Sequence, residues 1–373
     1  MTFVGARVAQ SAGRASLRHL QVPSRSIARI DAAGYLVLPG LINAHDHLEF
    51  NLYPRLGRGP YPNSKAWSED IYLPDRDPIR LHQQVPKAVR LLWGGVKNLL
   101  SGVTTVCHHN RRNDPTLDHG FPVRVVKRFG WAHSLDFSPD LRQRFLDTPK
   151  SWPFILHLGE ATDAHGREEI FRLHALGALD QRTVLVHGVA LDPKGRSLLR
   201  RSGGSLIWCP SSNLFMLGRT LEPAVFRSNL PVALGSDSAL TADGDLLDEL
   251  QVAQRSASPG SLYRMVTDVP RRLLRLPIQA GDVVLFRDSG LDPAETLLAA
   301  GPPELVVVAG KVRLASSVLA ERLPVSMVRR MYRFLVDGRE MLCDVDVGRL
   351  WRETAEVLGP DFRLAGKQVL PCT

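Results

Sequence analysis

Histidine and carboxylate side chains stand at the ends of several short apolar segments of the sequence. They are His45, His47, His157, His187 and Asp237. In an extended strand alternate side chains share a face, so His45 and His47 point together and Asp46 points away. Imidazole nitrogens and a carboxylate oxygen are donors that suit Zn²⁺ or Fe²⁺. The pattern therefore predicts one divalent ion, with Zn²⁺ favoured, held by His45, His47, His157 and Asp237.

A lone His-x-His pair also occurs among ordinary buried histidines, so the elements around these residues decide the interpretation. Apolar segments that predict strands cover residues 41–48, 103–109, 123–126, 154–158, 183–187, 205–209 and 231–237. Segments with helical spacing cover 77–101, 167–179 and 195–203, while 51–70 is too rich in turn residues to predict an element. Strands that alternate with helices indicate a parallel α/β fold, here a (β/α)8 barrel of the TIM type. The carboxyl ends of its strands converge on one face, where active sites lie.

One part of this barrel is too short for its regular share of elements. Only 46 residues separate Asn110 from His157, which is little for two complete strand–helix units. We therefore expect the third or fourth unit to be abridged.

The two ends of the chain share a sequence pattern that differs from that of the barrel region. Residues 1–37 and 278–315 contain short β-branched segments joined by glycine turns, without helical spacing between them. They predict one small β-sandwich domain built from both ends, with the barrel, residues 38–277, inserted between them. The remaining residues, 316–373, predict a helical tail with helices near 326–338 and 347–359.

Five motifs in this order resemble one known group of enzymes. VLPGLINAHDHLEF (37–50) resembles the first-strand signature of the amidohydrolase superfamily, and HLGE (157–160) resembles its fifth-strand motif. VLVHG (184–188), WCPSSNLFMLGR (208–219) and VALGSDS (232–238) are similar to its later motifs. The combination is most similar to the branch that processes cytosine, guanine and atrazine, and the resemblance extends from about residue 30 to 313.

The resemblance also implies a role for each residue. It makes His45, His47, His157 and Asp237 metal ligands, with Asp237 also the acceptor of a proton. Glu160 carries protons to the leaving group, and His187 polarises the group under attack. Many members hold a second ion on a lysine after the fourth strand, but no lysine here stands clearly at that position, which favours a single ion. The family's GTDG is GSDS in this chain.

The predicted reaction is the hydrolysis of a carbon–nitrogen bond, with removal of an amino group from a heterocycle or amidine-like small molecule. The alternatives are hydrolysis of a cyclic amide, a ring C–N bond or a C–Cl bond, and a scaffold without activity. We expect Asp46 and Asn213 to hold the loops that carry the ligands. Candidate substrate contacts are Trp67, Arg55 and His109, which stand in loops after the first two barrel strands.

Composition narrows the class of partner. The 373 residues carry a net charge of +9, but only eight of the 47 basic residues are lysine and the arginines form no run. This spread argues against nucleic acid. No apolar run reaches the ~18 residues of a membrane span. Four widely separated cysteines without a CxxC pair indicate a reducing, cytoplasmic setting. The expected partner is a small-molecule substrate, and a homodimer is left open.

Overall fold

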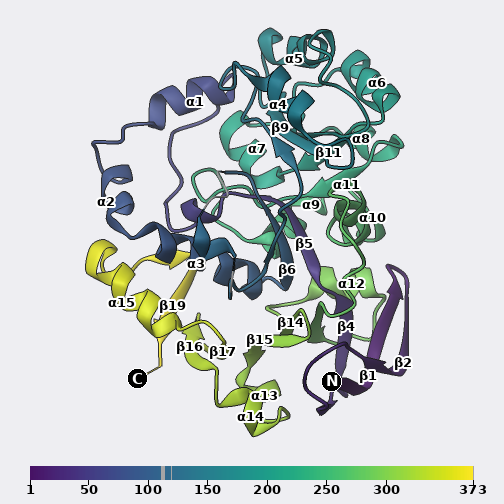
Figure 1. Ribbon diagram of the computed structural model, residues 1–373, viewed down its shortest axis with the longest axis vertical. Helices are drawn as coiled ribbons and strands as arrows, with labels where there is room; N and C mark the ends of the chain where they lie inside the picture. The colour runs from purple at the N-terminus through teal and green to yellow at the C-terminus, as the bar shows by residue number, and fades with distance from the viewer. Residues whose placement is uncertain (111–113, 119, 373) are drawn as a thin grey trace.

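The upper part of the molecule in Figure 1 is built on eight parallel strands in chain order. The structure, a computed structural model, describes residues 1–110, 114–118 and 120–372. The strands are β5 (Leu41–Asp46), β6 (Val103–His108), β7 (Arg124–Val125), β8 (Gly130–Trp131), β9 (Phe154–Leu158), β10 (Thr183–His187), β11 (Ser205–Trp208) and β12 (Val232–Leu234). β5–β7 form one ladder and β8–β12 another, and an isolated bridge between Asp46 and Asp237 links β5 to the segment after β12. This is a TIM-barrel-like α/β fold whose ladder of strands is not continuous.

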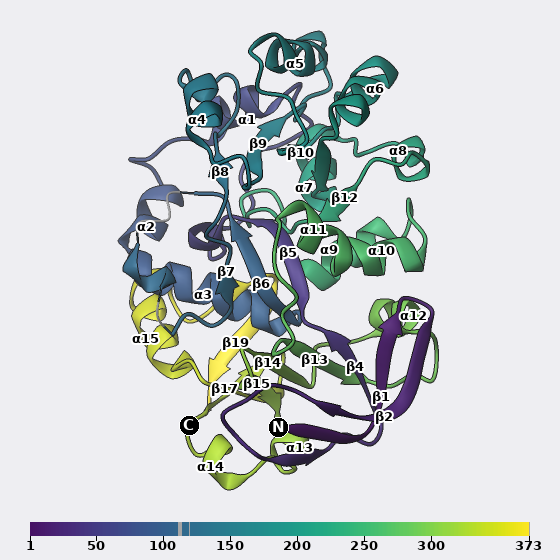
Figure 2. The same cartoon turned by 45° about the vertical axis from the view of Figure 1, so that its right-hand side comes forward.

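Helices surround these strands (Figures 1 and 2). They are η1 (Leu48–Phe50), α1 (Ser64–Ile71), α2 (Ile79–Gln84), α3 (Lys87–Leu100), η2 (Pro115–Leu117), α4 (Leu141–Asp147), α5 (Ala164–Ala175), α6 (Pro193–Ser202), α7 (Pro210–Leu217), α8 (Pro223–Arg227), α9 (Leu246–Ala253), α10 (Pro259–Met265) and α11 (Asp268–Leu273). The region expected to be abridged lies at β7 and β8, because only residues 126–129 separate these two strands and they form no helix.

Two sequence expectations about helices were wrong. The helix expected over 77–101 is divided into α2 and α3, because Pro86 has no amide hydrogen with which to continue α2. The segment 51–70, expected to be irregular, contains the start of α1. Its N-terminus is satisfied by Asn63, whose side chain accepts a hydrogen bond from the Ala66 amide at 2.9 Å.

Strands from both ends of the chain pair in one mixed sheet below the barrel (Figure 2). Its members are β1 (Thr2–Ser11), β2 (Arg14–Gln21), β3 (Arg29–Asp31), β4 (Tyr35–Pro39), β13 (Val283–Arg287), β14 (Leu305–Val308), β15 (Lys311–Ser316), β16 (Tyr332–Val336), β17 (Arg339–Cys343), β18 (Arg363–Leu364) and β19 (Lys367–Pro371). The antiparallel pair of β4 and β13 joins the two ends of the sequence, with Val37 opposite Leu285. α12 (Pro293–Ala299) connects β13 to β14.

The prediction of a helical tail over residues 316–373 was wrong, because this segment also contains strands. The helix expected near 326–338 is the short α14 (Val325–Val328) followed by strand β16, and β16–β19 extend the mixed sheet. Between β15 and α14 lies α13 (Ser317–Ala320), and the second expected helix is α15 (Val347–Leu358). α15 packs against the barrel helix α3. In this contact the Trp93 indole nitrogen on α3 donates to the Thr354 hydroxyl on α15 at 2.8 Å.

The barrel is filled with apolar side chains below the site. Ile42, Ile155, Val186 and Ile207 come from four different strands and belong to one buried cluster. The polar residues predicted to bind metal lie above this cluster, at the carboxyl ends of the strands. Among the described residues, no helix has the length and apolar character needed to cross a membrane.

Candidate active site

The residues predicted to bind metal converge at the carboxyl ends of three strands. His45 lies near the end of β5, His157 on β9, and Asp237 three residues beyond β12. The ligand atoms of His45, His47 and Asp237 lie within 4.8 Å of one another, and so do those of His45, His157 and His187. The side chains are buried, with His45 fully covered and His157 and Asp237 each 5% exposed.

Hydrogen bonds assign which nitrogen of each central imidazole carries a proton. His157 Nδ1 lies 2.9 Å from the carbonyl oxygen of His133 and must donate to it, which leaves Nε2 with a free lone pair. His109 Nε2 donates to the Ala132 carbonyl at 3.2 Å, so its Nδ1 accepts from His45 Nδ1 at 3.2 Å. The Nε2 atoms of His45 and His157 therefore both present lone pairs, 3.3 Å apart. Two facing lone pairs at that distance repel unless a cation or a proton lies between them.

The other two histidines follow the same pattern. His47 Nδ1 donates to the Asn110 side-chain oxygen at 3.1 Å, so its Nε2 faces Asp237 Oδ1 at 3.6 Å. His187 Nδ1 donates to the Asn213 side-chain oxygen at 2.8 Å, so its Nε2 faces the site. Burial lowers the pKa of His45 to about 4, against the attraction of Asp237, and it lowers the pKa values of His47 and His157 too. These imidazoles are neutral at pH 7, the form that binds metal.

Asp237 is the anionic member of the group. Its Oδ1 lies 3.5 Å from His45 Nε2, and its Oδ2 accepts a hydrogen bond from the Ser212 hydroxyl at 2.7 Å. Burial alone would raise the pKa of this carboxyl, but the imidazoles of His45, His187 and His47 hold it well below its ordinary value. Both Asp237 (φ 55°) and His187 (φ 73°) have left-handed backbone conformations, which non-glycine residues seldom adopt.

Glu160 follows the turn at the end of β9 and faces His187. Its Oε1 lies 3.1 Å from His187 Nε2. Burial raises the pKa of Glu160 to about 7; the charge of His187 opposes this rise, and that of Asp237 adds to it. Because His187 Nδ1 already holds its hydrogen, a single proton shared by Glu160 and His187 Nε2 satisfies both atoms. Such a pair can deliver and take up a proton near neutral pH.

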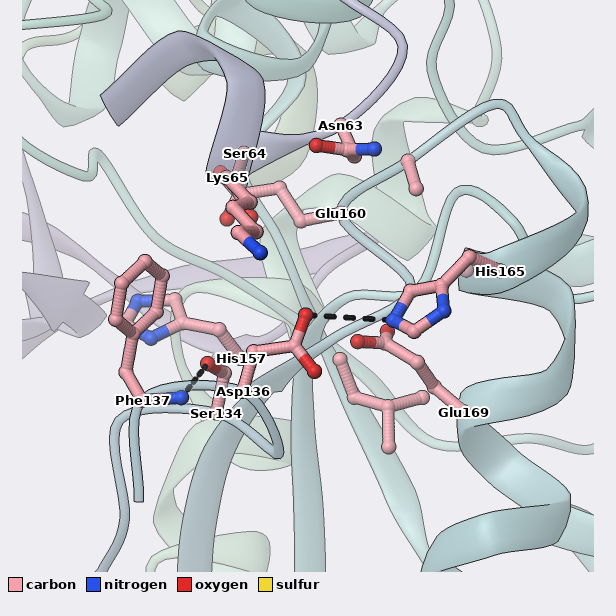
Figure 3. A pocket seen from close by; sticks show the side chains of 13 residues that line it. Asn63, Ser64, Lys65, Ser134, Asp136, Phe137, His157, Glu160, His165 and Glu169 are labelled. Atoms are coloured by element: carbon pink, nitrogen blue, oxygen red, sulfur yellow. Dashed lines mark hydrogen bonds and ion pairs between the residues drawn. The ribbon is translucent and has the colours of Figure 1, made fainter. Parts of the chain in front are cut away.

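A cavity of about 410 Å³ opens beside Glu160 (Figure 3). Glu160 and His157 line it together with Phe137, Asp136 and Glu169. Asp136, His165 and Glu169 bring their ligand atoms within 4.8 Å of one another. The guanidinium of Arg172 lies 3.3 Å from His165 and 3.7 Å from Asp136, however, so these side chains form an ion-pair cluster.

A buried polar group, which we name the floor, lies beneath His45 and His47. It consists of Asn43, Asp46, Asn51, Lys97, Asn98 and Ser236. The Lys97 ammonium lies 3.3 Å from Asp46 Oδ2 and donates to Asn51 at 2.8 Å and Ser236 at 3.1 Å. Its side chain is 2% exposed, and that of Asp46 is fully buried. The backbone of this segment also packs closely against His45. The Ser236 amide donates to the His45 carbonyl, and a Cβ atom added at Gly235 would lie 2.7 Å from the Cβ atom of His45.

Comparisons with known proteins were made on the sequence and on the fold. No family model matches the chain. It is 29% identical over 317 residues to 5-methylthioadenosine/S-adenosylhomocysteine deaminase of Halobacterium salinarum. The aligned region covers 70% of this chain and 71% of the relative. Its fold is similar to a zinc-bound adenosine deaminase from Xanthomonas campestris (TM-score 0.64, 16% identity, 88% of this chain and 86% of that chain). It is also similar to a zinc complex of atrazine chlorohydrolase from Arthrobacter aurescens (TM-score 0.65, 17% identity, 95% and 99%).

These relatives and structural neighbours together indicate the amidohydrolase superfamily. This confirms the resemblance found in the sequence, and with it the prediction of an enzyme that hydrolyses carbon–nitrogen bonds.

The three substrate contacts predicted for this amidohydrolase do not line the cavity beside Glu160. His109 is buried and contacts His45, as described above. The Trp67 indole nitrogen donates to the Leu56 carbonyl at 2.9 Å, and Arg55 pairs with Asp243 at 2.7 Å. None of the three lines the cavity beside Glu160.

Sequence reasoning missed two residues of the amidohydrolase site. His133 orients His157 through its carbonyl, and its ring centroid lies 4.8 Å from that of His157. It follows β8, a strand of only two residues, although its position after an apolar pair resembles that of the other strand-end histidines. Lys97 lies on α3, where a lysine in a helical pattern gives no sign of burial.

Proposed function

We propose that this amidohydrolase removes an amino group from a small heterocyclic substrate, with one divalent ion held by His45, His47, His157 and Asp237. The observation that carries the proposal is a chain of close approaches among ligand atoms: the Nε2 atoms of His45 and His47 lie 3.5 and 3.6 Å from Asp237 Oδ1, and His157 Nε2 lies 3.3 Å from His45 Nε2. Each of these lone pairs is fixed by a hydrogen bond at the opposite ring nitrogen. Three neutral imidazoles and one carboxylate are a donor set that fits Zn²⁺. The similar adenosine deaminase and atrazine chlorohydrolase structures contain zinc, which supports that choice over Fe²⁺.

A divalent ion in this position supplies Lewis acidity, which lowers the pKa of water toward ~7 and makes hydroxide available at neutral pH. The protein's own groups move the protons. Asp237, whose pKa is held low, accepts the proton of the attacking water. Glu160 delivers a proton to the departing amine, because its raised pKa of about 7 keeps part of it protonated at neutral pH. His187, oriented by Asn213, points its Nε2 toward the reacting group and polarises it.

An adenosine-like molecule is the substrate class that we propose. The curated relative is named for deamination of 5-methylthioadenosine and S-adenosylhomocysteine. The cavity beside Glu160 has a volume of about 410 Å³, which exceeds what a bare six-membered ring occupies, and Phe137 offers it an aromatic surface. Its ionisable lining suits a polar substituent on the base.

The test measures metal content and ammonia release across a panel of nucleosides, purines, pyrimidines and triazines. Wild-type protein should contain one divalent ion and release ammonia from an aminopurine nucleoside. Glu160→Gln should keep the ion and lose about 10²–10⁴-fold in kcat, because an amide cannot carry the proton. His45→Ala should lose ion and activity together, and Glu168→Gln, a change at an exposed position on α5, should alter neither.

Two outcomes would contradict this assignment. Loss of the ion in Glu160→Gln would make Glu160 a ligand. Chloride or ring-opened product without ammonia would replace deamination with one of the alternative hydrolyses.

We further propose that residues 1–37 and 278–315 form a separate small β-sandwich domain beside a barrel of residues 38–277. The pairing of β4 with β13 supports this. Deletion of residues 1–30 should make the protein insoluble or lower its Tm, because it removes β1 and β2 and uncovers β4. A deletion variant that stays soluble with an unchanged Tm would show that the two ends are independent. A cytoplasmic location and a homodimer also remain proposals.

A further inference from the structure

The short turn that carries Glu160 must be held precisely for that residue to reach His187. β9 ends at Leu158, and Glu160 follows after a single residue, Gly159. Gly159 adopts φ 67°, and a Cβ there would lie 3.3 Å from the Gly188 Cα. The turn therefore packs directly against the chain that follows His187, and a small rotation of it would change the 3.1 Å separation of Glu160 and His187.

Neighbouring loops hold the carbonyl groups of this turn. The Leu158 carbonyl accepts from the Gly188 amide and the Gly159 carbonyl accepts from the Ala190 amide, both at 2.9 Å. The Glu160 carbonyl accepts from the Ser64 amide at 3.0 Å. The amide of Gly159 is held by a side chain: it donates to Glu169 Oε2 at 2.6 Å.

Glu169 is placed unusually for a glutamate on an outer helix. It lies on α5, is 8% exposed, and lines the same cavity as Glu160 (Figure 3). Its neighbour Glu168 on the same helix is exposed to solvent. Burying a carboxyl group costs free energy unless the group is hydrogen-bonded. Burial raises the pKa of Glu169 to about 7, and the hydrogen bond from the Gly159 amide opposes this rise. The buried carboxyl thus makes its short hydrogen bond at the turn before Glu160.

We propose that Glu169 is a positioning residue, which holds the Gly159 amide and thereby places the Glu160 carboxylate beside His187. The proposal rests on the proposed role of Glu160 as the group that carries protons. Glu169 acts on Glu160 through the Gly159 amide, to which it is hydrogen-bonded. Removal of its acceptor should let the turn rotate while the metal ligands, fixed by other contacts, remain in place.

The experiment compares Glu169→Ala, Glu169→Gln and the matched control Glu168→Ala. Hydrogen exchange of the peptide that contains Gly159 is measured together with metal content, Tm, kcat and KM. Glu169→Ala should speed exchange at the Gly159 amide by about 10–100-fold, because the amide loses its hydrogen bond to the buried carboxyl group. Its kcat should fall by about 10–100-fold, as is typical for loss of a supporting contact, with metal content unchanged and KM within about threefold.

The glutamine variant separates positioning from general loss of structure. The amide side chain in Glu169→Gln keeps an oxygen that can accept from the Gly159 amide, so this variant should restore slow exchange and most of kcat. Glu168→Ala should match wild type in every measurement. If Glu169→Ala does not fold, Glu169→Asp replaces it: the shorter side chain cannot reach the amide, and it should show the same fast exchange and low kcat.

Three results would overturn the proposal. They are unchanged exchange at Gly159, unchanged kcat, and loss of the metal ion, the last of which would mean that Glu169 supports His157. Failure of the proposed function looks different, because the wild type would then release no ammonia from any compound while the exchange measurement would still report on the Gly159 bond.

Discussion

The two sides of the site are built in different ways. On the floor, the Lys97 ammonium and the Asp46 carboxylate are both buried, and side-chain amides and a hydroxyl complete their hydrogen bonds. On the cavity side, Glu160 and His187 meet each other and are each supported by few contacts, and Glu160 keeps a side-chain exposure of 12%. The floor supports His45, His47 and Asp237, whereas the cavity side carries the proposed proton transfer. Changes to the floor should therefore affect stability first, and changes to the cavity side should affect rate.

The largest effect is expected from Lys97→Met. This change leaves the Asp46 carboxylate buried without its counter-charge, and breaking a buried pair in this way costs about 3–5 kcal/mol. We expect low soluble yield or a strongly lowered urea midpoint. The double variant Asp46→Asn with Lys97→Met removes both charges and should recover most of that loss, and Lys194→Met, at an exposed position on α6, should change nothing. A Lys97→Met protein of wild-type stability would show that the floor tolerates an unpaired carboxylate.

This contrast also explains which features the sequence could predict. The histidines at strand ends could be found because their position follows from the period of a strand and the direction of a parallel barrel. The partner of Asp46 could not, because Lys97 lies more than fifty residues away in a helix and becomes buried only when α3 packs under β5. The segment Tyr332–Val336 was misjudged for a related reason. Its mixed pattern fits a helix as well as a strand, and only the neighbouring β17 and β19 decide between them.

A smaller effect, on rate alone, is expected from Asn213→Ala. Its side-chain oxygen fixes the His187 Nδ1 proton, and without it the imidazole can rotate or change tautomer. We expect kcat to fall by about 10–100-fold. Metal content should stay the same, since His187 is not among the proposed ligands. Steady-state kinetics and elemental analysis of the same samples test this, with Asn229→Ala, an exposed position before β12, as the control. Loss of metal in Asn213→Ala would add His187 to the ligand set.

The smallest effect is a change in the pH dependence of stability, and it concerns a second buried carboxyl beside the site. Glu249 on α9 is fully buried; its Oε2 accepts from the Ser211 amide at 3.0 Å, and no hydrogen bond reaches Oε1 from the described residues. Unlike Asp46 it has no cation in contact among those residues, and burial raises its pKa from the ordinary 4.5 to about 8. Lys97 neutralises the Asp46 carboxylate, whereas a retained proton neutralises Glu249.

The sign of the effect follows from that raised pKa. The folded protein holds the Glu249 proton while the unfolded chain releases it above about pH 4.5, so the stabilising contribution of the neutral acid is complete below that pH and is lost as the pH rises through about 8. Glu249→Gln mimics the neutral form at every pH. Relative to this variant, the wild type should therefore lose stability between pH 5.5 and 7.5, at a rate of at most about 1.4 kcal/mol per pH unit.

Urea unfolding at several pH values, with the two proteins at equal metal content, measures the slope. Glu69→Gln, whose side chain is 68% exposed, should run parallel to the wild type. Parallel curves for wild type and Glu249→Gln would mean that Glu249 is ionised in the folded protein, and that this region tolerates a buried carboxylate without a cation in contact with it.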